Sequence, residues 1–233
     1  MITFDKGFYS HENFSLQIDL KIGDQNFCVV LGPSGAGKST LLNIIAGFES
    51  LVSGTLIIDG HDLTGAPPTD RPISMIFQDN NVFAHMTVQN NVAIGIDPSL
   101  KLSRTQLHDV QAALERVGLD QYNTRLPGNL SGGERQRVAL ARVLVRQSKI
   151  LLLDEPFAAL DPGLRLEMLK LVQDITTERK LTTLLVTHQP DEAKRVAQSV
   201  IFIDGGVVQK PQKTHAFFNQ TRPEVAKYLG QSN

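Results

Sequence analysis

The sequence predicts a mostly parallel α/β fold that is interrupted by a helical subdomain. Strand-like apolar segments alternate with helical segments over most of the chain, the pattern of a parallel sheet with crossover helices. One apolar strand leads directly into a glycine-rich loop at 32–37 and then a helix. From about residue 85 to about residue 148 the pattern is only helical, which indicates an inserted subdomain.

Four strands are predicted before the insert. The segment 14–22 roughly alternates apolar and polar residues, which indicates one buried face. The segment 27–31 is continuously apolar, which is typical of a strand buried on both faces. Shorter strands are predicted at 54–60, between glycine turns, and at 73–77.

Three helices are predicted within the insert. Thr87 is a candidate cap for the first, and Ser103 for a second that stops at Gly118. Ser131 opens the third. Beyond the insert, strands at 150–153, 182–186 and 200–203 alternate with helices at 162–179 and 190–198. A short hairpin and two short helices are predicted after about 205.

Composition excludes several classes of protein. The 233 residues carry 23 basic and 24 acidic side chains, so net charge gives no reason to expect nucleic acid as a partner. The longest unbroken apolar run has five residues, whereas a membrane-spanning helix needs about 20. The amino terminus lacks the features of a signal peptide. The single cysteine, Cys28, fits a reducing compartment and a role in core packing.

The loop GPSGAGKS at 32–39 matches the phosphate-binding pattern G-x-x-x-x-G-K-[ST], also called Walker A, between a buried strand and a helix. Its glycines let backbone N–H groups approach a phosphate, and the helix amino terminus adds partial positive charge. Lys38 supplies a full charge for the β- and γ-phosphates, and Ser39 a hydroxyl for Mg²⁺. The alternative is an ordinary flexible glycine loop.

Two further motifs point to phosphate chemistry. In ILLLDE, an apolar strand carries Asp154 to the edge of the sheet where ligands bind, and Glu155 can deprotonate a water there. The alternative is an exposed turn. In LSGGERQR, Ser131 and Glu134 form a capping box, and the two glycines between them suit a close approach to an anion. The alternative is a helix start and nothing more.

These three motifs, in this order and spacing, resemble those of the ATP-binding cassette (ABC) ATPases over about residues 3–210. The resemblance implies a P-loop NTPase of the ABC type, with an antiparallel β subdomain and a mostly parallel RecA-like core sheet. The core would comprise 1–84 and 149–210, the helical subdomain 85–148, and a short extension 211–233.

The resemblance also assigns roles to single residues. Tyr9 would stack on adenine, Gln78 would sense Mg²⁺ and water, and His188 would contact the γ-phosphate. Each has an ordinary alternative; for Tyr9 it is a half-buried strand aromatic. The expected catalytic residues are Glu155, His188, Gln78 and Lys38, and the expected metal ligands are Ser39, Gln78 and Asp154. The expected nucleotide-binding residues are Tyr9, Gly32, Pro33, Ser34, Gly35, Ala36, Gly37, Lys38, Ser39, Thr40, Ser131, Gly132, Gly133 and Asp161.

In this family, two copies join head to tail and share two ATP sites, and ATP binding and hydrolysis close and reopen the dimer. The resemblance therefore implies ATP and Mg²⁺ as ligands, a homodimer and an integral-membrane permease. A periplasmic substrate-binding protein would be an indirect partner, and the location would be the cytoplasmic face of a bacterial inner membrane. Val82, Phe83 and Met86 would suit the permease contact, although local packing explains them almost as well.

Within the family, the stretches 71–88, 126–146 and 150–162 resemble the ATP-binding subunits of importers for thiamine and thiamine pyrophosphate. The alternatives are an importer for another small solute such as iron or a polyamine, or an exporter. A DNA-linked ABC ATPase and a stand-alone P-loop kinase fit the sequence poorly.

Overall fold

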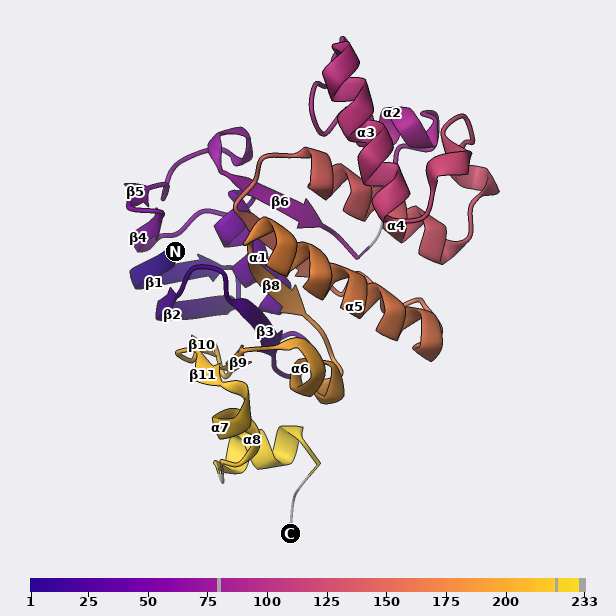
Figure 1. The fold of residues 1–233 in the computed structure, drawn as a ribbon. Helices are drawn as coiled ribbons and strands as arrows, with labels where there is room; N and C mark the ends of the chain where they lie inside the picture. Colours follow the sequence, from indigo (N-terminus) through magenta and orange to yellow (C-terminus); the bar gives the residue numbers. More distant parts are fainter. Residues whose placement is uncertain (79–80, 221, 231–233) are drawn as a thin grey trace.

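One eleven-stranded sheet organises the chain, whose residues 1–78, 81–220 and 222–230 are described by the computed structural model (Figure 1). Half of the sheet is mostly antiparallel: β1 (Ile2–His11), β2 (Phe14–Ile22), β4 (Ser53–Ile58), β5 (His61–Asp62) and β10 (Val207–Val208). The other half is mostly parallel: β3 (Phe27–Leu31), β6 (Ile73–Ile76), β7 (Ile150–Asp154), β8 (Thr182–Val186), β9 (Ser199–Asp204) and β11 (Gln212–Lys213). The halves meet at β10, which pairs with both β2 and β9.

Strand β3 lies in the middle of the parallel half, between β9 and β8, and runs parallel to both. Every residue of β3 is buried. Val29 and Leu31 face one apolar cluster, and Cys28 and Val30 face the other. The continuous apolar run therefore reflects a strand covered on both faces, as predicted. Burial raises the pKa of the Cys28 thiol to about 12, which agrees with its predicted role in packing.

Eight α-helices complete the described fold: α1 (Lys38–Ala46), α2 (Val88–Ala93), α3 (Arg104–Arg116), α4 (Gly132–Val145), α5 (Pro162–Arg179), α6 (Pro190–Val196), α7 (Thr214–Phe218) and α8 (Pro223–Tyr228). Helices α2, α3 and α4 pack on one another, and Figure 1 shows them as a group beyond the end of β6. Val92, Leu114 and Val138 of this group belong to the same apolar cluster as Val29 of β3. The insert therefore shares a core with the sheet.

Three predicted helix starts are confirmed by side-chain caps. Thr87 accepts a hydrogen bond from Asn90 N–H, and Ser103 and Ser131 each form a complete capping box. The bounds of α5 and of β2 also match their predicted ranges. Polar side chains that can cap a helix amino terminus therefore mark these boundaries well.

Strand β1 was not predicted, because its burial pattern changes phase. Ile2 and Phe4 are buried, and then Gly7 and Tyr9 are buried instead of the alternate positions. A bulge shifts the pairing register with β2 between Phe4 and Gly7, and Lys6 within it has φ 47°. A fixed alternation of two cannot describe such a strand.

The segment after 210 packs onto the core. Strand β11 pairs with β9, and Phe217 of α7 and Val225 of α8 have no exposed surface. The ring of Phe202 in β9 lies 5.8 Å from that of Phe217 and 5.4 Å from that of Tyr228. None of the helices in the described ranges is long and apolar enough to cross a bilayer.

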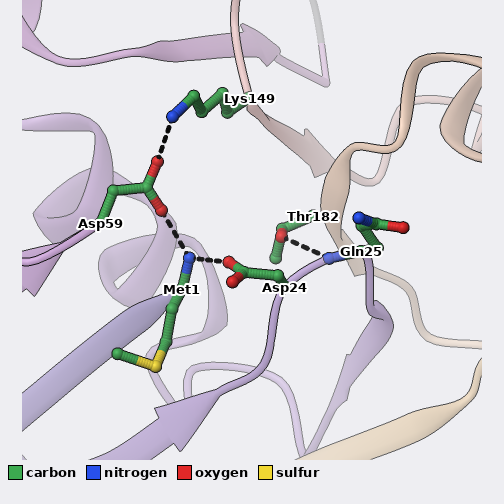
Figure 2. A network of polar contacts seen from close by, with 6 residues as sticks. All are labelled: Met1, Asp24, Gln25, Asp59, Lys149 and Thr182. Atoms are coloured by element: carbon green, nitrogen blue, oxygen red, sulfur yellow. Dashed lines mark hydrogen bonds and ion pairs between the residues drawn. The ribbon is translucent and has the colours of Figure 1, made fainter.

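A polar network joins chain segments at the amino ends of the parallel strands (Figure 2). The α-amino group of Met1 contacts the carboxylates of Asp24 and Asp59. Asp59 also accepts a hydrogen bond from Lys149, which directly precedes β7, at 2.9 Å. This network thus lies at the edge of the sheet opposite to the edge at which the parallel strands end.

Candidate nucleotide-binding and active site

The carboxyl ends of β3, β7 and β8 bring together two of the predicted motifs, the glycine-rich loop and the Asp154–Glu155 pair, and His188. Because these strands are parallel neighbours, the segments that follow them meet at one edge of the sheet. A cavity of about 330 Å³ opens there. Its lining consists of Phe14, Ser34, Gly35, Gly37, Lys38, Ser39, Thr40, Glu155 and His188.

The glycine-rich loop has a conformation that side chains would obstruct. Gly32 has φ 154°, and a Cβ there would lie 2.3 Å from the carbonyl oxygen of Ile203 in β9. Gly37 has φ 101°, and a Cβ there would lie 2.5 Å from the ring of Phe14. Both positions therefore require glycine, and the loop can wrap closely around a phosphate.

The side chain of Lys38 reaches back into the glycine-rich loop that precedes it. Its Nζ donates hydrogen bonds of 2.9 Å to the carbonyl oxygens of Gly32 and Pro33, and the side chain is almost wholly buried. Burial lowers the pKa of Lys38, while the charges of Glu155 and Asp154 act against this shift. A buried ammonium held by two backbone carbonyls of the loop is suited to bind the charged oxygens of a phosphate chain.

Ser39 and Asp154 form an oxygen-rich pair that fits Mg²⁺. Ser39 Oγ donates to Asp154 Oδ1 at 3.0 Å, although the residues are far apart in sequence. Burial raises the pKa of Asp154, and the hydrogen bond from Ser39 counteracts this. Hydroxyl and carboxylate oxygens are ligands that Mg²⁺ prefers. Gln78, the third expected ligand, is exposed after β6 and does not line the cavity; residues 79 and 80 lie outside the described residues.

Glu155 and His188 are in direct contact. His188 Nε2 lies 2.5 Å from Glu155 Oε1, and both residues line the cavity that contains Lys38 and Ser39. The backbone of Glu155 has φ 45°, in the left-handed region that is strained for a residue with a side chain. Its N–H donates to Val186 O of β8 at 3.1 Å. The fold thus places a carboxylate and an imidazole together beside the glycine-rich loop.

The segment 131–133 and Asp161 lie outside this cavity. Ser131 accepts from Glu134 N–H, while the Glu134 carboxylate accepts from Ser131 N–H, which lowers the pKa of Glu134. Asp161 Oδ1 accepts from Leu164 N–H at 3.0 Å and caps α5. Within one chain, these residues build helix starts and do not contact the Lys38 cavity.

The two glycines after Ser131 have different surroundings. A Cβ on Gly133 would lie 2.5 Å from Leu164 Cδ2 of α5, whereas the nearest atom to one on Gly132 is 3.6 Å away. The sequence predicts that both glycines allow a close approach by an anion. At Gly133, packing against α5 already explains the small residue.

Tyr9, which the family resemblance predicts to stack on adenine, is mostly buried and does not line the cavity. The Tyr9 ring is 6% exposed within the core, and its hydroxyl donates to Glu49 at 3.1 Å. The reason is the bulge at Lys6, which turns Tyr9 towards the interior. Phe14, at the start of β2, lines the cavity instead. Its position next to the hairpin turn is the only sequence signal that marks it.

Comparisons with known proteins agree with this geometry. A family model described as ABC transporter matches residues 16–158. The thiamine import ATP-binding protein ThiQ of Mesorhizobium japonicum is 48% identical over 232 residues, which are 99% of this chain and 92% of the relative. That of Salmonella typhimurium is 52% identical over 200 residues, 85% of this chain and 84% of the relative.

Solved structures of ATP-binding cassettes share the fold. The ADP conformation of MJ1267 has a TM-score of 0.87 at 22% identity and covers 99% of this chain and 98% of its own. A nucleotide-free ATP-binding cassette from an ABC transporter has a TM-score of 0.81 at 22% identity, with 98% and 94% covered. The sequence match, the fold and the assembled phosphate-binding motifs agree: this chain belongs to the ABC transporter family, as one of its ATP-binding ATPase subunits.

Proposed function

We propose that this protein is the ATP-hydrolysing subunit of a thiamine importer. The observation that carries the hydrolytic part is the Glu155–His188 contact beside Lys38 and Ser39. The thiamine part is supported by the printed names of relatives that are 48% and 52% identical. It depends on those relatives alone, because in an importer of this kind the solute passes through the permease.

The segment 32–40 would bind the phosphates of ATP through its backbone N–H groups and Lys38. Phe14 would take the contact with the adenine that the family resemblance assigned to Tyr9, because Phe14 lines the same cavity as the phosphate-binding loop. Ser39 and Asp154 would hold Mg²⁺, and Gln78 would join them after a movement of the segment that follows β6. The metal would neutralise charge on the phosphates.

Glu155 would accept a proton from the attacking water, and its position beside the phosphate loop supports this role. His188, in contact with Glu155, would orient it and reach the γ-phosphate. Such a reaction depends on positioning and charge, not on a covalent intermediate.

A second copy of the chain would complete each site. Ser131, Gly132, Gly133 and Asp161 lie outside the cavity of their own chain, and the segment 131–133 presents a helix amino terminus that suits an anion. Two copies placed head to tail would bring these residues to the ATP of the partner. ATP binding would close this dimer, and hydrolysis would reopen it.

The permease would dock beside β6 and the start of the insert. Phe48, Phe77 and Phe83 are 55%, 39% and 47% exposed, and the rings of Phe48 and Phe77 lie 5.7 Å apart. Large exposed apolar side chains of this kind suit a partner surface. The protein would thus act at the cytoplasmic face of the inner membrane, with a periplasmic binding protein as an indirect partner and no role for nucleic acid.

Reconstitution tests the choice of solute. The subunit, its permease and the solute-binding protein would be placed in vesicles, and ATP hydrolysis measured with thiamine, thiamine pyrophosphate, spermidine or ferric iron. We expect stimulation by thiamine or its pyrophosphate only. Stimulation by a different solute alone would assign the subunit to another importer, and a complex with Glu155→Gln would serve as the inactive control.

A further inference from the structure

We infer that Arg165 and Glu192 are positioning residues that hold Glu155 and His188 in their mutual contact. The inference rests on the proposed hydrolysis of ATP and concerns two side chains outside the motifs. Arg165 lies in the first turns of α5, and Glu192 in α6. Both are largely buried, with side chains 15% and 10% exposed.

Arg165 holds the segment that follows Glu155. Its Nε donates to Phe157 O at 3.2 Å, and its Nη2 donates to Ala158 O and Leu160 O at 3.0 Å each. Three carbonyls of one short loop therefore share a single guanidinium. Glu155 at the start of this loop has a strained backbone, which persists only when its surroundings hold it in place.

Glu192 holds the segment that carries His188. Thr187 Oγ1 donates to Glu192 Oε2 at 2.5 Å and also accepts the N–H of Gln189 at 3.1 Å. His188 lies between these two residues. Its backbone is therefore fixed on both sides by a hydroxyl that Glu192 anchors.

The side chains of Arg165 and Glu192 approach each other next to Glu155 and His188. Arg165 Nε lies 3.9 Å from Glu192 Oε1, and both line a small cavity of about 90 Å³ that Glu155 and His188 also line. The Glu155 loop and the His188 loop thus share one support. A change in either support would alter the separation of the carboxylate and the imidazole, and not the loop that binds the phosphates.

The test separates turnover from binding in the full-length chain. Arg165→Met keeps most of the apolar stem of Arg165 but loses its hydrogen bonds, and Glu192→Gln retains an acceptor for Thr187 but loses the charge. We expect kcat for ATP hydrolysis to fall about 10-fold or more in Arg165→Met, because small misplacements of reacting groups are costly. The Kd for ATP should stay within about twofold, since Lys38 and Ser39 are untouched. Arg179→Met, at the exposed end of α5, is the matched control.

A double variant tests whether Arg165 and Glu192 act together on the same contact. If they do, Arg165→Met with Glu192→Gln should lose little more than the larger single effect. Additive losses would overturn the shared support. Equal losses of kcat and ATP affinity, or a wild-type kcat in Arg165→Met, would overturn the positioning role.

The melting temperature of each variant is measured as well. Slow turnover counts as loss of positioning only in a variant that is folded at the assay temperature and binds ATP normally. Failure of the proposed function has a different signature. It would appear as absence of Glu155-dependent ATP hydrolysis in the unmodified protein.

Discussion

The imidazole Nε2 of His188 lies 2.5 Å from the carboxylate Oε1 of Glu155, although the two residues follow different strands. The contact is possible because β7 and β8 are parallel neighbours that end together. It pairs an acceptor of protons with a group that can orient it, beside the loop that carries Lys38.

Replacing Glu155 with Gln should abolish most turnover and leave ATP binding intact. The amide keeps the size of the side chain but cannot accept a proton, and removal of a general base lowers rates by about 10²–10⁴-fold. An ATP-bound dimer should accumulate, which size-exclusion chromatography with ATP would detect. Turnover close to that of the unmodified protein would remove Glu155 from the role of base.

Replacing Lys38 with Met should weaken ATP binding. The change removes the buried ammonium between Gly32 and Pro33 while keeping an unbranched chain, so the loss is one of charge. We expect at least about a 10-fold rise in the Kd for ATP, because hydrogen bonds to charged groups contribute about 1.5–3 kcal/mol. Lys149→Met, at the opposite edge of the sheet, should bind ATP normally. An unchanged Kd in Lys38→Met would contradict this placement of the phosphates.

Replacing Phe14 with Leu should raise the Kd for ATP by about 10-fold, because stacking of a base on an aromatic ring is worth about 1–3 kcal/mol. Tyr9→Leu is the matched variant, since it also removes an aromatic ring from the same hairpin. It should lower stability through lost packing and leave the Kd unchanged. A higher Kd in Tyr9→Leu, with none in Phe14→Leu, would restore the original assignment to Tyr9.

Replacing Ser131 with Arg should block turnover without preventing ATP binding by the single subunit. A large cation at this helix start would obstruct the approach of a second copy. It would also remove a cap, at about 1 kcal/mol of stability. Ser103→Arg removes the corresponding cap of α3 and controls for that loss. Equal turnover in the two variants would argue against a shared site.

The network around Asp59 should contribute stability that depends on pH (Figure 2). Hydrogen bonds from the α-amino group of Met1 and from Lys149 lower the pKa of Asp59. A lowered pKa in the folded state gives stability that is present above the unfolded pKa and is lost as pH falls through the folded pKa.

Asp59→Asn should therefore have a lower free energy of unfolding than the unmodified protein at pH 7. The difference should be below about 1 kcal/mol, because Lys149 of the Asp59–Lys149 ion pair is largely exposed. Asn also tolerates the positive φ of this position. Urea titrations should show the difference shrinking as pH falls below about 4, the ordinary pKa of Asp, and vanishing only below the lowered folded-state pKa of Asp59, where the carboxylate is protonated in both states. A constant difference across this range would mean that the charge has no part in it, and Asp5→Asn, an exposed carboxylate on β1, is the control.

The sequence predicted the features that depend on neighbouring residues. The apolar run of β3, the glycine-rich loop and the caps Ser103 and Ser131 are all local patterns with a direct physical meaning. The glycine-rich loop and the strand ILLLDE also placed Lys38, Ser39, Asp154 and Glu155, whereas His188 was expected from the family resemblance. The assembly of these five at one edge follows from parallel pairing alone.

Tertiary contacts defined the features that the sequence did not predict. The bulge at Lys6 changes which face of β1 Tyr9 occupies, and no alternation pattern in the sequence marks it. The need for glycine at 133 depends on Leu164 of another helix. Arg165 and Glu192 come together only because α5 and α6 pack side by side. An arginine and a glutamate in predicted helices are usually surface residues, so the sequence did not mark Arg165 and Glu192 as partners.

The central place of β3 also constrains the order in which the protein can form during synthesis. This strand and its phosphate loop leave the ribosome early, yet both neighbours of β3 belong to the last third of the chain, at 182–186 and 199–204. A nascent chain that ends before residue 182 can pair β1 with β2 and build the insert, but β3 still lacks both of its partners. The binding site therefore becomes complete only when nearly the whole chain has emerged, and a ligand that binds it would stabilise finished molecules and not partial ones.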